Sequence, residues 1–489
     1  MKGKLKMKQQ KKTFKAILLG LGCLAFLPQM QGVSPPPDGC YPNSTTAEGC
    51  KALQSLTTGV ANTGIGWYSL FATDSGSYNT AVGAGALDLN NADNNTAVGV
   101  AALLRNTTGT NNTANGVAAL VFNDSGEGNT ATGAFALYSN TEGQFNTANG
   151  EFALYFNTTG ERNTAIGDSA LYLNTEGSGN TAVGNPALLS NVIGNDNTAV
   201  GASALRDSIG SENTAIGANA LSANTTGQVN TALGAKTLLN NTDGGFNTAA
   251  GYSALITNEN GSYNTANGYN ALRLNISGSD NTAVGDGALF SNTSGGQNTA
   301  LGENAGFNQT TGSSNVYIGA GIVGVAGESN ACYIASIFNQ TSASGAQVFI
   351  NANNKLGTNT SSKRFKSDIQ PMNNASETLF SLKPITFRYK KEIDPTGISQ
   401  FGLVAEDVEQ VNPDLVVRDK EGKPYSVRYD QVNAMLLNEF LKEHRTVQAQ
   451  QNEIDALKQE LKDQRALIEK VTARIGLDKT GTQLVVGKL

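Results

Sequence analysis

The sequence is poor in charged and aromatic residues. Of its 489 residues, only 15% are charged and 7% aromatic, whereas glycine alone accounts for 56. The only histidine, His444, lies far from the glycine-rich first part of the chain, which therefore holds no histidine-based catalytic set. Calcium-binding coils of the G-G-x-G-x-D type are also absent. This composition favours a repetitive structural assembly over a set of compact enzymes, and we expect neither a cofactor nor a metal.

Basic residues are scarce across the middle of the chain. Between residues 62 and 330 there are five Lys or Arg against nineteen Asp or Glu, while the whole chain has a net charge of −6. Such a surface repels nucleic acid and anionic lipid. We therefore expect no nucleic-acid partner.

Long apolar runs are almost missing, and the one that exists is near the N-terminus. Seven lysines within the first 15 residues precede an apolar run from Ala16 to Leu27, which ends before the breaker "VSPPPDG". The run is too short to span a bilayer, which takes about 20 apolar residues. Residues 1–32 therefore predict a signal peptide, followed by a polar segment at 33–61, and the mature protein is expected to be secreted or at the cell surface.

Cysteine is limited to four residues, one of which, Cys23, leaves with the signal peptide. Cys40 and Cys50 lie ten residues apart in a polar, exported segment, where a local disulfide is expected. Cys332 then has no partner, and we expect it to be a small buried residue.

The dominant feature of the sequence is a repeat of about 17 residues. The pattern N-T-A-x-G-x-x-A-L-x-x-N-x-x-G-x-x occurs in sixteen copies, with thirteen gaps of 17 residues and two of 16. Glycine stands four residues after the first Asn in every copy, and Leu stands eight after it in the first fourteen. The copies begin at Asn62, Asn79, Asn95, Asn112, Asn129, Asn146, Asn163, Asn180, Asn197, Asn213, Asn230, Asn247, Asn264, Asn281, Asn298 and Asn315.

A unit this short, with two glycine-marked corners, fits one coil of a parallel β-solenoid. We expect a strand over N-T-A-x-G and a second strand around A-L, with the leucines forming one core ladder. Sixteen coils would rise about 75 Å at the interstrand spacing. The threonines either line a flat outer face, of a kind that can bind ice or carbohydrate, or point inward; ligand binding by this ladder is disfavoured.

The NTAxG repeats resemble the head repeats of trimeric bacterial adhesins, whose N-S-x-A-I-G-like coils form parallel β-rolls in threes. The resemblance covers Asn62 to about Gly319, although the adhesin coils are shorter than 17 residues and their membrane-barrel anchor is missing here. We assign residues 62–350 to a β-solenoid fibre and 351–360 to a linker.

The composition changes after Asn351. Charged helical segments alternate with strand-like "ITFRYKK" and "YSVRYD", which predicts a small α+β core at 361–428. A helix follows at 429–475, then a tail at 476–489. Its apolar residues keep one heptad frame. Up to about His444 they could pack on the helix's own domain, but beyond it nothing local is available, so we expect a coiled coil of identical chains. The frame consists of Leu436, Phe440, Val447, Ile454, Leu457, Leu461, Ile468 and Val471.

Three motifs in this region resemble the intramolecular chaperone domain of phage tailspikes, endosialidases and tail fibres, the peptidase S74 family. They are "SSKRFKSDI", "FGLVAEDVEQVNPDLV" and "YDQVNAMLLNEFLKEH". The resemblance implies a device that brings three chains into register and then cuts itself off. It places the nucleophile at Ser361 and its basic partner at Lys366, so that the cleaved bond is Thr360–Ser361.

Residue chemistry is compatible with that assignment. A serine hydroxyl is already close to the carbonyl of the preceding residue, and a neutral lysine amine can take its proton. Burial or a neighbouring cation favours the neutral amine, and Lys363 and Arg364 are close in sequence. Two positions depart from the family pattern: Ser362 replaces the usual Asp, which puts efficient cutting in doubt, and Phe365 replaces Leu.

The sequence therefore predicts a secreted, homotrimeric fibre with a C-terminal chaperone that cleaves itself. One alternative is a surface adhesin that binds a glycan or a host protein and keeps its trimerisation domain. Exposed aromatic residues would favour it, and Trp67 and Tyr68 are the candidates. A prophage tail fibre is the other alternative, against which the signal peptide argues.

Overall fold

The computed structural model describes residues 42–338, 340, 342–343 and 345–481. The chain divides into two compact units, Met1–Gln340 and Thr341–Leu489. The predicted signal peptide, Cys23 and Cys40 lie outside the described residues, so the export signal and the Cys40–Cys50 disulfide stay predictions. Cys50 is exposed.

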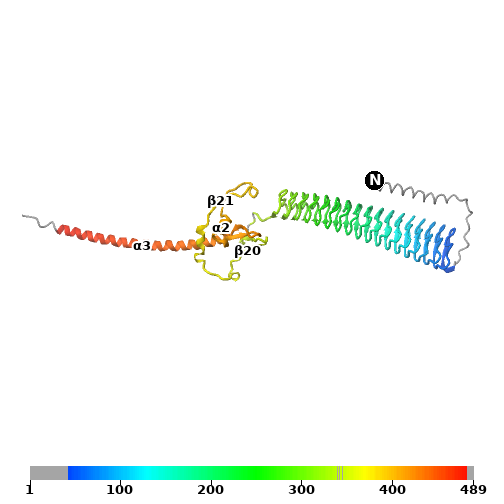
Figure 1. Ribbon diagram of the computed structural model, residues 1–489, viewed down its shortest axis with the longest axis horizontal. Coiled ribbons are helices and arrows are strands. Elements are labelled where there is room, and N and C mark those ends of the chain that lie inside the picture. Colours follow the sequence, from blue (N-terminus) through cyan, green and yellow to red (C-terminus); the bar gives the residue numbers. More distant parts are fainter. Residues whose placement is uncertain (1–41, 339, 341, 344, 482–489) are drawn as a thin grey trace, which may run out of the picture. The chain divides into compact units, whose positions relative to one another are not determined.

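The first unit is a parallel β-solenoid, as predicted (Figure 1). Every coil contributes one three-residue strand, and each strand pairs in register with the strands of the coils before and after it, for example Thr147 opposite Thr164. The 18-stranded sheet has one strand before and one after the sixteen copies counted from the sequence. Its strands are β1 (Thr46–Glu48), β2 (Thr63–Ile65), β3 (Thr80–Val82), β4 (Thr96–Val98), β5 (Thr113–Asn115), β6 (Thr130–Thr132), β7 (Thr147–Asn149), β8 (Thr164–Ile166), β9 (Thr181–Val183), β10 (Thr198–Val200), β11 (Thr214–Ile216), β12 (Thr231–Leu233), β13 (Thr248–Ala250), β14 (Thr265–Asn267), β15 (Thr282–Val284), β16 (Thr299–Leu301), β17 (Val316–Ile318) and β18 (Cys332–Ile334).

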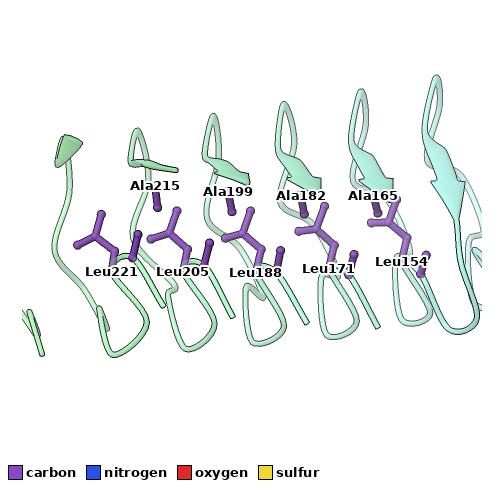
Figure 2. Close-up of a cluster of buried hydrophobic side chains, with 14 of the residues drawn as sticks. Leu154, Ala165, Leu171, Ala182, Leu188, Ala199, Leu205, Ala215 and Leu221 are labelled. Carbon is purple, nitrogen blue, oxygen red and sulfur yellow. The ribbon is translucent and has the colours of Figure 1, made fainter. Parts of the chain in front are cut away.

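The core of the solenoid consists of stacked small and branched apolar residues. Figure 2 shows Leu154, Leu171 and Leu188 in one line, facing the strand alanines Ala165 and Ala182. All of these side chains are fully buried. The predicted leucine ladder is confirmed, and the alanines keep the coil thin enough for one leucine per coil to fill it.

The structure corrects one detail of the predicted coil and decides another that the sequence left open. The A-L segment forms turns rather than a second strand, and its leucine takes a left-handed conformation, with φ of +52° at Leu154 and +54° at Leu171. Such backbone costs about 1–2 kcal/mol in an L-residue, and burial of the leucine offsets it. The strand threonines do not point inward, because Asn and Ala already occupy the inner face; they are half-exposed or exposed.

Two ladders of buried asparagine side chains connect successive coils. In the ladder at the start of the strand, Asn146 Oδ1 accepts from the backbone N–H of Asn163 at 2.9 Å. In the ladder at the closing turn, Asn157 Nδ2 donates to Asn140 Oδ1 at 2.7 Å and to the carbonyl of Gly160 at 2.9 Å. Burying these amides is tolerated because each finds its partners in its own turn and in a neighbouring coil.

Glycine four residues after the first Asn is required by the backbone. Gly150 has φ of +146°, and a Cβ there would lie 2.4 Å from the carbonyl oxygen of Gly167 in the next coil. Any side chain would push neighbouring coils apart, which explains why this glycine occurs in every copy.

The C-terminal end of the solenoid is closed by a tyrosine. Gly306 takes the place of the core leucine, and Tyr317, from the following coil, is fully buried beside it and stacks on Tyr333 at 5.7 Å between ring centroids. The expectation of a buried Cys332 is wrong. Cys332 begins β18, at the position where other coils have an outward threonine, and it is exposed.

The second unit contains small two-stranded sheets, short helices and one long helix, α3 (Figure 1). Its small core comprises Val408, Leu415, Val416, Val427 and Met435. Among the described residues, no helix is both long and apolar enough to cross a membrane. The elements are β19 (Val348–Ile350), β20 (Leu356–Thr358), η3 (Lys363–Phe365), η4 (Asn373–Ser381), β21 (Ile385–Phe387), β22 (Gln400–Gly402), α2 (Ala405–Val411), η5 (Pro413–Leu415), β23 (Val416–Arg418), β24 (Pro424–Val427) and α3 (Tyr429–Gly481).

One interruption of the turn ladder provides a test of its contribution. Ser208 occupies the position of the turn asparagine, and the buried Oδ1 of Asn191 in the preceding coil has no hydrogen-bond partner. Asn90, in the other 16-residue coil, shows that asparagine fits a turn of this length, since it donates to Ala92 O at 2.8 Å. We predict that Ser208→Asn stabilises the solenoid by about 1 kcal/mol, seen as a higher denaturant midpoint.

Asn157→Ser is the matched control, because it opens the same gap in an intact part of the ladder. It should destabilise the solenoid by about 1–2 kcal/mol. Equal midpoints for both variants and the unchanged protein would show that the turn ladder contributes nothing.

Candidate functional site

The predicted cleavage point lies between a hairpin and a single helical turn of the second unit. β19 and β20 pair antiparallel, with Val348 opposite Thr358, and the bond Thr360–Ser361 follows two residues later. Two backbone hydrogen bonds form the turn of η3: Phe365 N–H donates to Ser362 O at 3.0 Å, and Lys366 N–H donates to Lys363 O at 3.2 Å. The turn brings the side chain of Lys366 back toward Ser361.

The structure brings the two predicted site residues together. Lys366 Nζ lies 3.0 Å from Ser361 Oγ, within hydrogen-bond distance. Both residues are exposed and line an open depression of about 660 Å³, together with Lys363, Asp368 and Ile369. A chain segment or water can therefore reach the serine hydroxyl directly.

The pair can perform acyl transfer without a metal or a histidine. With the lysine charged, Nζ donates to the hydroxyl; with the lysine neutral, the same contact lets the hydroxyl donate its proton to Nζ. The serine oxygen would then attack the adjacent carbonyl carbon of Thr360. This arrangement has a nucleophile, a base in contact with it and access for water.

One family model matches this region of the chain. Residues 361–417 match the family model described as chaperone of endosialidase, peptidase S74. The match to this chaperone-of-endosialidase model begins at Ser361 itself. No curated protein and no solved structure matches the chain. A match to this family model, after a parallel β-solenoid in the sequence, is consistent with the tailspike-like architecture that the sequence suggested.

The two departures from the family pattern both lie in or beside η3. Ser362 precedes the turn in an extended conformation, and its side chain makes no capping hydrogen bond. Phe365 is 59% exposed, and the guanidinium of Arg364 lies 4.6 Å from its ring centroid. Neither side chain intervenes between Ser361 and Lys366.

A polar cluster holds η4 against α3 and was not predicted. The buried hydroxyl of Ser376 accepts from Asn438 Nδ2 at 2.6 Å and donates to the carboxylate of Glu439. Lys442 hydrogen-bonds Glu439 at 2.8 Å and Glu377 at 3.2 Å. The hydrogen bond from Lys442, aided by that from Ser376, lowers the pKa of Glu439. These contacts fix the first turns of α3 to the core.

The heptad residues of α3 lie on the surface of the single chain. All eight are between 45% and 64% exposed. An apolar stripe of this length on an otherwise polar helix is typical of a coiled-coil seam. They are Leu436, Phe440, Val447, Ile454, Leu457, Leu461, Ile468 and Val471.

The solenoid also carries exposed aromatic residues. Of the pair named from the sequence, Trp67 is exposed and Tyr68 is half-buried, and their rings are in edge contact at 4.4 Å between centroids. A second group was missed. We call it the aromatic strip: in two successive coils, aromatic residues both precede and follow the strand motif, in "FNTAAGY" and "YNTANGY". The strip comprises Phe246, Tyr252, Tyr263 and Tyr269, which are between 45% and 59% exposed.

A third aromatic group serves packing instead. Tyr138, Tyr155 and Tyr172 stack in successive coils, with centroid distances of 4.9 and 5.4 Å, and all three are half-buried. Burial, together with the neighbouring tyrosines, raises the pKa of Tyr155 to about 12. These rings stack on one another and are less exposed than those of the aromatic strip.

Proposed function

We propose that this protein is an exported, homotrimeric fibre whose C-terminal unit assembles three chains and then cuts itself off at Thr360–Ser361. Ser361 is the nucleophile and Lys366 the base. The observation that carries the proposal is the 3.0 Å contact between Lys366 Nζ and Ser361 Oγ, at the first residue of the family match.

Each step of the cleavage is accounted for by this pair and water. Ser361 Oγ bonds to the carbonyl carbon of Thr360 while the peptide C–N bond breaks, which turns the amide into an ester. Lys366 takes the hydroxyl proton and returns it to the leaving amine of Ser361. Water then hydrolyses the ester, which leaves a carboxylate on Thr360 and a free hydroxyl on Ser361.

Assembly through α3 is supported by the exposed heptad stripe and by the small core of the second unit. Large apolar residues elsewhere in this unit are also exposed, among them Phe380 at 77% and Phe401 at 83%. Association with identical chains would cover such surface. Each coil of the solenoid needs its neighbours to form its hydrogen bonds. Holding three chains in register at one end would shorten the search of the coils for their correct partners during folding.

The test is the intact mass, under denaturing conditions, of the protein produced without residues 1–32. We predict a 129-residue fragment (489 − 360) that begins at Ser361. Ser361→Ala should abolish it, because the nucleophile is gone, and Lys366→Ala should reduce it at least about 100-fold, since proton transfer contributes about 10²–10⁴.

Ile369→Ala is the matched control, because Ile369 lines the same depression but its side chain carries neither a charge nor a hydrogen-bonding group. It should cut as fast as the unchanged protein. Uncut protein in all samples, or cutting that survives both site substitutions, would refute the dyad.

A second candidate function, glycan binding along the fibre, is favoured by the aromatic strip. Phe246 stacks on Tyr263 at 4.9 Å and Tyr252 on Tyr269 at 5.8 Å, with exposed Thr248 and Thr265 in the strands between them. The two coil segments, residues 245–252 and 262–269, contain no charged residue. Aromatic rings next to hydroxyl and amide groups suit a neutral polysaccharide.

Affinity electrophoresis of the Ser361→Ala protein tests this function. We predict that a neutral glucan in the gel slows migration and that Tyr252→Ala/Tyr269→Ala removes the effect. Tyr78→Ala is the control, since Tyr78 is more exposed than either strip tyrosine but lies in a distant coil. Retardation that is absent, or that persists in the double variant, would rule out the strip as the glycan site.

A further inference from the structure

The segment that carries the cleaved bond is attached to the start of α3. Asn359 Nδ2 lies 3.5 Å from Asp430 Oδ2, although the two residues are 71 positions apart. Asn359 directly precedes Thr360, whose carbonyl carbon would be attacked. The bond therefore has a contact on each side, Asn359 to Asp430 before it and Ser361 to Lys366 after it.

The first turn of α3 provides a fixed position for Asp430. The hydroxyl oxygen of the neighbouring Tyr429 accepts a hydrogen bond from the backbone N–H of Leu403 at 3.0 Å. On the other side, Arg428 N–H donates to Leu415 O at 2.8 Å, next to the buried end of β24. One turn later Met435 is part of the core. A side chain on such an anchored turn can hold a partner more accurately than one on a free loop.

We propose that Asp430 is a positioning residue for self-cleavage. Through Asn359 it holds the Thr360 carbonyl next to Ser361 Oγ, and it thereby makes cutting depend on α3 being folded onto the core. The inference rests on the proposed self-cleavage. Asp430 exchanges no proton in any step; it acts only on the geometry, where a misplacement of about 1 Å can cost about 100-fold in rate.

The chemistry of the pair distinguishes positioning from a purely structural role. Asp430 is also the acidic residue in the first turn of α3, where its charge favours the helix. If that were its whole contribution, residue 359 would be irrelevant. In the positioning role, Asn359→Asp places two carboxylates against each other, whereas Asp430→Asn leaves an amide oxygen that still accepts from Asn359.

The experiment measures the rate at which the 129-residue fragment appears, by intact mass, in the protein without residues 1–32. Asn359→Asp should slow cleavage about 10- to 100-fold, while Asp430→Asn stays within about threefold of the unchanged protein. The exchanged pair Asn359→Asp/Asp430→Asn should recover to within about threefold, because donor and acceptor are restored in reverse. Gln431→Ala, on the next residue of the same turn, is the matched control and should have no effect.

Three results would overturn the inference while leaving the proposed function intact. The first is an Asn359→Asp protein that cuts at the unchanged rate. The second is an exchanged pair that stays as slow as Asn359→Asp. The thermal midpoint of helix unfolding, followed by circular dichroism, is recorded for every variant. Slowing that tracks a lowered midpoint would mean a structural role and would also overturn the inference. If the unchanged protein does not cut at all, it is the proposed function that fails.

Discussion

Coil-on-coil registry is the constraint on which the solenoid depends. A single 17-residue coil can satisfy neither its strand hydrogen bonds nor its two buried asparagines, because the partners of both lie in neighbouring coils. The same registry leaves no room for a side chain at the glycine that follows each strand. Stability is therefore a property of the stack, and each end of the stack needs a device of its own. At the C-terminal end that device is Tyr317, which fills the space that a leucine fills elsewhere.

Much of this fold could be read from the sequence, since the residues that control it repeat. The repeat predicted the single coil and the leucine ladder. It did not reveal the turn at A-L. Period-2 alternation assumes extended backbone, and nothing about a leucine indicates the left-handed conformation seen at Leu154. Cys332 was misplaced for a related reason: a small apolar residue suggests a core, but its place in the coil is the outward threonine position.

The candidate site, too, could be predicted only in part from the sequence. Ser361 and Lys366 were found through a motif within one short segment, where family resemblance is informative. Two side-chain hydrogen bonds join residues more than 60 positions apart, namely Ser376 to Glu439 and Asn359 to Asp430. A single sequence without repeats carries no signal for such pairs. The aromatic strip was visible as two neighbouring copies with aromatic residues on both sides of N-T-A, but its exposure required the structure.

The two units differ in how far each completes its own packing and hydrogen bonding. The solenoid carries its ladders within residues 46–334, so loss of residues 361–489 removes none of its own hydrogen bonds. In its described part, the second unit has five buried apolar side chains and a long exposed heptad stripe. In the proposed account it gains its core by association, aligns three chains and becomes dispensable once the coils have stacked. The proposed cleavage site lies near the start of the second unit, after the solenoid in the sequence, and suits that order of events.

The most direct test compares the same fibre made with and without its C-terminal unit. Residues 33–360 released from the full-length protein by self-cleavage and residues 33–360 produced alone would be compared by native mass spectrometry. The account predicts a stable trimer from the full-length protein, and monomers or aggregates from the fibre produced alone. Identical trimers from both routes would contradict it, since the C-terminal unit would then be unnecessary for assembly.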